Sequence, residues 1–143
     1  ILADIFQTFR IQMKPAVMLP DAAAPGGPCI PGQKRLFVSV DGNLYPCERV
    51  SETSLVMQIG NLKDGFDFKK VDKLLNIAQG TAEDCKDCWA FRHCTLCGRQ
   101  SDNCGELSVD LRRSQCENVR AQVEDLFRDY LWMREFGISE DTL

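Results

Sequence analysis

Cysteine is the residue type whose number and spacing in this sequence indicate chemistry. The chain of 143 residues contains eight cysteines, and all of them lie between Cys29 and Cys116. Two pairs have the spacing Cys-x-x-Cys, at 85–88 and 94–97, which places two thiols on one short loop. This spacing suits a shared metal better than a disulfide bond between distant strands. Because one such metal centre takes four thiolates, the eight cysteines predict two centres.

A disulfide framework and bound zinc are the alternatives to iron–sulfur clusters. Secreted domains also use dense, even sets of cysteines. The sequence has no pattern of a secretory signal, so we expect a cytoplasmic protein in which the thiols stay reduced and bind metal. The ligand count does not distinguish zinc ions from 4Fe–4S clusters, since both use sets of four thiolates. A zinc-stabilised binding module and a stand-alone electron-transfer protein both fit this count.

The segments around the cysteines predict a small α+β domain with a β-hairpin, irregular Cys-rich loops and flanking helices. Apolar residues alternate over 35–48 around the turn dipeptide Asp41-Gly42, which predicts the hairpin. Its reversal would bring Cys29 and Cys47 together at the open end. A weaker strand is expected at 55–59, ended by Gly60 and Asn61.

The Cys-rich span 84–104 has too few aliphatic residues to form a core by itself. Ordering such a span costs more conformational entropy than its own apolar burial offsets. We therefore expect bound metal to stabilise this part of the domain.

Helical periodicity is clearest near the end of the chain. An apolar stripe runs from Val119 to Leu131, and Gly137 follows as a stop signal. Cys116 lies on the same stripe near the helix start, where the helix dipole favours a thiolate. A second helix is expected from the N-cap Asp67 to Gly80. The apolar face predicted for that second helix consists of Phe68, Val71, Leu74, Leu75 and Ala78.

The charge of the chain limits its possible partners, and its Pro- and Gly-rich stretch indicates where the domains begin and end. The net charge is −4 and the basic residues are scattered, so we expect neither nucleic acid nor a membrane as a partner. We expect an N-terminal helix and a Pro- and Gly-rich linker at 1–28, the cysteine domain at 29–137, and a tail at 138–143. The chain begins at Ile1 rather than Met, so we expect it to be part of a longer protein.

The order of the cysteines resembles the SPASM domain, the C-terminal auxiliary-cluster module of radical S-adenosylmethionine enzymes. The spacings Cys29-x12-Gly42-x4-Cys47 and Cys85-x2-Cys88-x5-Cys94 fit the family pattern, and Cys116 fits its last position. The two-residue interval to Cys97 departs from the usual three. The resemblance spans about 110 of the 143 residues, far more than a short-motif match. Segments that look like the members acting on Cys-rich ribosomal peptides are Leu36–Val40, Asp41–Val50, Ile59–Leu62 and Cys88–Ala90.

The resemblance implies two interleaved ligand sets for two 4Fe–4S clusters. Family members often have one more ligand for the first cluster ahead of the first motif cysteine, where this chain has Ala23. The first cluster would then keep an open iron site for a substrate thiolate, or Cys104 would complete it. Cys104 has no place in the family pattern. The implied ligands are Cys29, Cys47 and Cys97 for the first cluster, and Cys85, Cys88, Cys94 and Cys116 for the second.

The function that the resemblance implies is that of an auxiliary domain in an enzyme that modifies a Cys-rich ribosomal peptide, with thioether formation as the candidate reaction. Its partners would be the precursor peptide and the catalytic domain of the same parent chain, which would bind S-adenosylmethionine. The CxxxCxxC motif of that catalytic domain is absent from this chain, so we expect the chain alone to be inactive. Zinc is expected to substitute at the same thiolates in protein produced aerobically.

Several residues beside the cysteines have both a functional and an ordinary interpretation. His93 is expected at the surface or supporting a ligand, rather than binding metal. Trp89 and Phe91 would either shield a metal centre or form ordinary core. For Glu48 and Arg49 we favour an exposed ion pair over a peptide contact.

Overall fold

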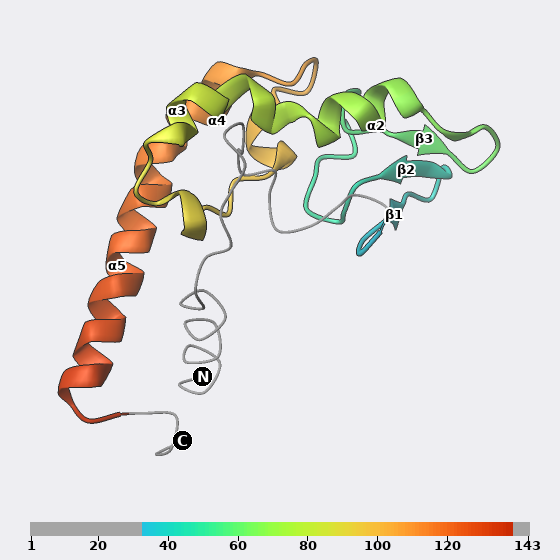
Figure 1. Ribbon diagram of the computed structural model, residues 1–143. Coiled ribbons are helices and arrows are strands. Elements are labelled where there is room, and N and C mark those ends of the chain that lie inside the picture. The colour runs from blue at the N-terminus through green and yellow to red at the C-terminus, as the bar shows by residue number, and fades with distance from the viewer. Residues whose placement is uncertain (1–32, 139–143) are drawn as a thin grey trace.

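A computed structural model describes residues 33–138 of the chain. The N-terminal helix and linker predicted at 1–28, Cys29 and most of the tail at 138–143 lie outside these residues. The architecture is α+β, with a small sheet followed by short helices and one long helix (Figure 1). The sheet and helix α2 lie at one end of the molecule, and helix α5 runs away from α3 and α4 at the other.

The sheet consists of four short antiparallel strands in the order β1-β2-β3-β4. Strands β1 and β2 form the hairpin predicted at 35–48, with Phe37 opposite Tyr45. Gly42 has a φ of 79°, which its missing side chain permits at this turn, so the prediction is confirmed. The strands span Phe37–Val38 (β1), Asn43–Tyr45 (β2), Gly60–Asn61 (β3) and Gly65–Phe66 (β4).

The strand predicted at 55–59 is wrong. The preceding Ser54 closes a turn there, because its hydroxyl oxygen accepts a hydrogen bond from the Met57 amide at 3.3 Å and its carbonyl accepts one from Gln58 at 3.2 Å. The pairing strand is β3, at the residues expected to end that strand, and β4 was not predicted. Met57 and Ile59 nevertheless belong to the buried core between the sheet and α2.

Helix α2, Phe68–Leu75, begins as predicted at Asp67, whose carboxylate accepts hydrogen bonds from two amides of the first turn. The α-helix ends at Leu75, and a 3₁₀ helix, η1, continues over Ile77–Thr81. Leu74 and Ala78 are buried, whereas Phe68 and Leu75, which share one edge of the apolar stripe at helical spacing, are exposed. The predicted inner face is therefore wrong for those two exposed residues.

The Cys-rich segment was predicted to form irregular loops, and it contains the short helices α3, η2 and η3 joined by such loops. After them comes a capped helix, α4, that the sequence analysis did not identify, and Ser108 caps it by accepting from the Leu111 amide at 3.1 Å. The elements are α3 (Ala82–Lys86), η2 (Phe91–His93), η3 (Gly98–Ser101), α4 (Val109–Ser114) and α5 (Cys116–Glu135).

Helix α5 ends at the predicted Gly137, which has a φ of 68°. The Gly137 amide donates to the Arg134 carbonyl at 3.1 Å, and the Ile138 amide donates to Met133 at 3.0 Å. These two bonds form a Schellman motif, which satisfies the last carbonyls of the helix. Met133 is buried at this end, whereas Leu131 is 63% exposed, so its assignment to the apolar stripe is wrong.

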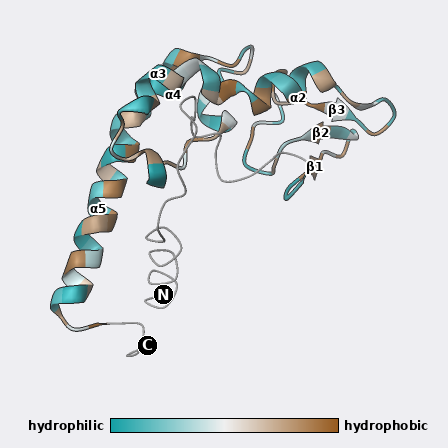
Figure 2. Ribbon diagram, viewed as in Figure 1, coloured by the Kyte–Doolittle hydropathy of each residue, from teal (hydrophilic) through white to brown (hydrophobic). Residues whose placement is uncertain are grey.

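Three apolar clusters are found among residues 33–138. The first lies between the sheet and α2, the second joins the Cys-rich loops to the first half of α5, and a third surrounds Met133 near the end of α5. Hydrophobic and hydrophilic residues alternate along α5 in Figure 2, as expected for a helix with one covered face. Among residues 33–138, no helix combines the length and apolarity that crossing a bilayer requires.

We predict that Gly60→Ala destabilises the sheet. An added Cβ would lie 2.3 Å from the Gly65 carbonyl oxygen and 2.9 Å from the Phe66 Cα, so the paired backbone must shift. The expected loss in the free energy of unfolding is about 1–3 kcal/mol, measured by urea titration. Gly105→Ala is the matched control, because its Cβ would meet only an Asn103 oxygen at 3.8 Å. Equal stability of the two variants would contradict the prediction.

Candidate metal centre

Successive tight turns carry the chain from α3 through the CxxC motif. The Cys88 amide donates to the Cys85 carbonyl at 3.2 Å, and the Phe91 amide donates to the Cys88 carbonyl at 3.0 Å. The Cys94 amide then donates to the Phe91 carbonyl at 3.2 Å. These i→i+3 bonds keep the three cysteines on one compact stretch of backbone.

Apolar packing brings this stretch against α5. Ala90 and Leu96, on either side of Cys94, are almost fully buried and pack in the same cluster as Val119 and Val123 of α5. Helix α5 begins at Cys116, one turn before Val119, so the packing places that cysteine opposite the loop.

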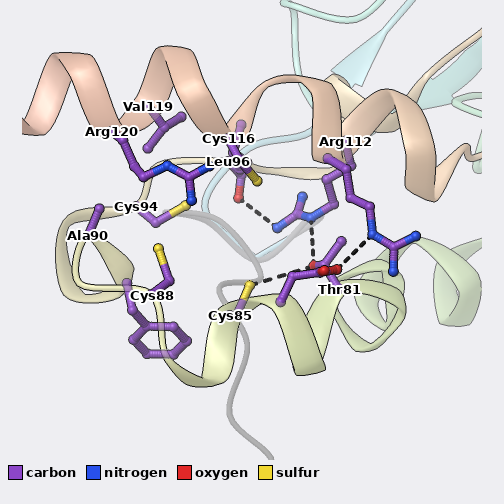
Figure 3. A pocket seen from close by; sticks show the side chains of 13 residues that line it. Thr81, Cys85, Cys88, Ala90, Cys94, Leu96, Arg112, Cys116, Val119 and Arg120 are labelled. Carbon is purple, nitrogen blue, oxygen red and sulfur yellow. Dashed lines mark hydrogen bonds and ion pairs between the residues drawn. The ribbon is translucent and has the colours of Figure 1, made fainter.

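Four cysteines consequently line one pocket between α3, the loop and the start of α5. Its volume is about 260 Å³, and its wall contains Cys85, Cys88, Cys94 and Cys116. In Figure 3 their sulfur atoms face the shared space. All four side chains are half-buried and carry free thiols. These are the residues that the family resemblance assigns to the second cluster.

The rest of the pocket wall is apolar or positively charged. Ala90, Leu96 and Val119 supply apolar surface. Three arginines also line the pocket, and the wall contains one carboxylate, Asp84, which pairs with Arg113 at 2.7 Å. The lining residues therefore carry an excess of positive charge, which favours an anion at this place. The three arginines are Arg112, Arg113 and Arg120.

Burial opposes thiolate formation in this pocket, and neighbouring charge assists it. Desolvation raises the pKa of Cys85 above its usual value, while a hydrogen bond with Thr81 and the charge of Arg112 act in the opposite direction. Desolvation likewise raises the pKa of Cys94, against the Leu96 backbone and Arg112. Metal binding at these thiols must therefore displace protons.

Arg112 is the residue of this site that the sequence analysis missed. It lies on α4 and is only 1% exposed. Its guanidinium donates to the Cys97 carbonyl at 3.0 Å, to the Leu96 carbonyl at 3.3 Å and to the Thr81 hydroxyl at 3.4 Å. The N-cap Ser108 is the sequence signal that identifies α4, but no local signal indicates that its arginine is buried.

The remaining predicted ligands are not brought into one group among the described residues. Cys47 is half-buried against the sheet core, and Cys97 hydrogen-bonds the side chain of Gln100 through its thiol at 3.1 Å. Cys104 is exposed and has a left-handed φ of 73°. Cys29 lies outside residues 33–138, which are the ones that the structure describes. Within 33–138, no three Cys, His, Asp or Glu side chains are gathered tightly enough to hold a metal ion as they stand. The four pocket thiols thus share a cavity without converging on a point.

The residues that had both a functional and an ordinary interpretation make aromatic contacts, line the pocket or form exposed ion pairs. Phe91 lines the pocket, whereas Trp89 is 55% exposed and packs beside Phe127 at a ring distance of 6.3 Å. His93 meets Phe127 edge to face at 4.9 Å, and burial lowers its pKa. Glu48 forms exposed ion pairs with Arg49 and Arg35, in agreement with the favoured interpretation.

Comparisons of this chain with protein-family models, curated proteins and solved structures give no match. The assignment of the site therefore depends on the residues and geometry described above.

We predict that Cys116→Ala removes one metal centre, because it deletes one of the four thiols of the pocket. Iron and sulfide after anaerobic reconstitution should fall to about half of the unsubstituted value, since the three remaining thiols come from α3 and the following loop and leave the α5 side of the pocket without a ligand. Full retention of both centres would exclude Cys116 as a ligand.

Cys104→Ala is the comparison, and we expect it to retain two centres because Cys104 is exposed and outside the pocket. Added peptide thiol should still perturb the spectrum of the first centre if that centre has an open iron site. Loss of one centre in Cys104→Ala would show that Cys104 is a ligand.

Proposed function

We propose that this chain is an auxiliary iron–sulfur domain that holds two 4Fe–4S clusters. The observation that carries the proposal is the pocket in which Cys85, Cys88, Cys94 and Cys116 come together from α3, the following loop and α5. Four thiols with an apolar and cationic surround suit a polynuclear anionic centre.

The family resemblance is what favours a cluster over zinc. The cavity of about 260 Å³ between the four thiols and the excess of positive charge on its wall are both compatible with an anionic iron–sulfur centre. When bound, a 4Fe–4S cluster would exchange single electrons, and the four cysteines would hold it by its irons.

The first centre would use Cys29, Cys47 and Cys97, with an open iron site or Cys104. Two observations support a location beside the sheet core. Cys47 packs on that core, and Gly98, which follows Cys97, lies against Leu74 of the same core. A Cβ at Gly98 would lie 2.3 Å from the Leu74 Cδ1, so glycine permits this close approach without a shift of the Leu74 side chain.

The resemblance to SPASM domains supports a place in a radical S-adenosylmethionine enzyme acting on a Cys-rich ribosomal peptide. In that enzyme the domain would position the peptide and transfer electrons, and thioether formation is the proposed reaction. The catalytic domain of the parent chain would bind S-adenosylmethionine, and this domain alone would be inactive. The enzyme would work in the cytoplasm, where thiols stay reduced.

The test is anaerobic reconstitution followed by metal analysis and electron paramagnetic resonance. We expect a brown protein with absorbance near ~400 nm from thiolate-to-iron charge transfer and iron and sulfide for two clusters. A colourless protein that takes up zinc and no iron under these conditions would contradict the proposal and support a zinc-stabilised binding module. Zinc in aerobically purified protein would decide neither case, because it can replace lost clusters at the same thiolates.

We also predict that removing the metal disorders the Cys-rich segment. Its buried hydrophobic residues are Ala90 and Leu96, which is little to offset the entropy of ordering 84–104. Proton–nitrogen NMR spectra of reduced, metal-stripped protein should lose dispersion for these residues. The sheet residues 37–66 serve as the internal reference, because their core does not include the pocket. Native-like peaks for 84–104 without metal would refute the prediction.

A further inference from the structure

The geometry points to Arg112 as a positioning residue that sets the charge balance of the four-cysteine centre. We infer that its buried guanidinium offsets the negative charge of the centre held by Cys85, Cys88, Cys94 and Cys116. The inference rests on the proposed function in requiring an anionic, thiolate-bound metal centre at this pocket. It goes beyond that function by assigning the charge control to one residue outside the cysteine pattern.

Arg112 occupies the pocket wall as a fixed group. Its Nη1 and Nη2 atoms reach the carbonyls of Cys97 and Leu96, and its Nε reaches the Thr81 hydroxyl. These contacts come from η1 and from the loop that follows Cys94, so both sides of the pocket orient the guanidinium. A planar fork held at three points has little freedom to turn away from the centre.

The guanidinium is also connected to a ligand thiol. The Cys85 thiol donates to the Thr81 hydroxyl oxygen at 3.8 Å, and the same oxygen accepts from Arg112 (Figure 3). Thr81 is itself only 2% exposed and donates to the Ala78 carbonyl at 3.1 Å. Thr81 thus fixes the position of the cation relative to Cys85.

Burial makes this charge effective. Arg112 is 1% exposed, so little solvent screens it from the pocket. The charge of Arg113, by contrast, is largely offset by Asp84 and lies where the side chain is 48% exposed. Because the net charge around a metal–thiolate centre and the hydrogen bonds at its ligands control its reduction potential and stability, Arg112 is the residue whose loss should change both.

The experiment compares three variants, Arg112→Gln, Arg112→Lys and Arg99→Gln. All are made in a Cys47→Ala background, which removes a ligand of the first centre so that the measured signal comes from the pocket centre alone. Arg99→Gln removes the same charge from an exposed position two residues after Cys97. The reduction potential of the reconstituted centre and the rate of metal release to a chelator are measured. Arg112→Gln should lower the potential and raise the release rate about 10–100-fold. Arg112→Lys should restore most of both values, and Arg99→Gln should match the background.

Each outcome bears on the inference. It is overturned if Arg112→Gln behaves as Arg99→Gln does, or if Arg112→Lys is as impaired as Arg112→Gln, since the shape of the side chain and not its charge would then matter. The inference is supported if Arg112→Gln loses the centre while Arg112→Lys retains it with a reduction potential close to that of the background. Failure of both variants to retain the centre overturns it.

The proposed function is tested separately by the iron, sulfide and colour of the unsubstituted protein. If that protein holds zinc, the chelator-release series is repeated with zinc, because a tetrathiolate zinc centre is also anionic. The ratio of release rates between the variants then tests Arg112 independently of the native metal.

Discussion

The burial of one guanidinium group is the constraint on which the arrangement of the Cys-rich segment depends. Removing a charge from water costs several kcal/mol unless hydrogen bonds satisfy its donors. Arg112 meets this requirement through carbonyls and a hydroxyl supplied by segments on either side of the pocket. Helix α4 must therefore lie against η1 and the 96–97 backbone, and α5, which follows α4 directly, then begins at the pocket. The position of Cys116 follows from this placement.

The apolar core beside the sheet and the second cluster, beside the Cys-rich loops, have different relations to the proposed metal. The core between the sheet and α2 contains Met57, Ile59 and Leu74, all nearly inaccessible, and it can form without the pocket. The second cluster has only four buried residues, and three of its half-buried members are the ligand candidates Cys88, Cys94 and Cys116. The hydrophobic effect and metal coordination would thus stabilise the same contacts in that half of the domain. An anionic centre there gains from surrounding positive charge and limited solvent access.

The local elements could be predicted because their signals lie within a few residues. Asp41-Gly42 determines the first hairpin turn, Asp67 begins α2, and Gly137 ends α5. The CxxC spacing also indicates that Cys85 and Cys88 share a centre, and the periodicity of α5 places Cys116 on the face of Val119. Short strands were harder to predict, because a two-residue strand such as β3 has no periodicity and depends on its partner. The hydroxyl of Ser54 converts the apolar run at 55–59 into a turn.

The amino-acid sequence by itself determined the number of thiols, their grouping and the capped elements that flank them, since spacing and capping act through neighbouring residues. The family resemblance implied that Cys116 joins Cys85, Cys88 and Cys94, and only the tertiary structure gives the physical cause, because packing of Leu96 and Ala90 on α5 brings the four to one pocket. The tertiary structure also decided that Arg112, an ordinary charged residue of a short helix in the sequence, is buried. That burial depends on hydrogen bonds to residues 15, 16 and 31 positions away, and no local pattern encodes contacts over such separations.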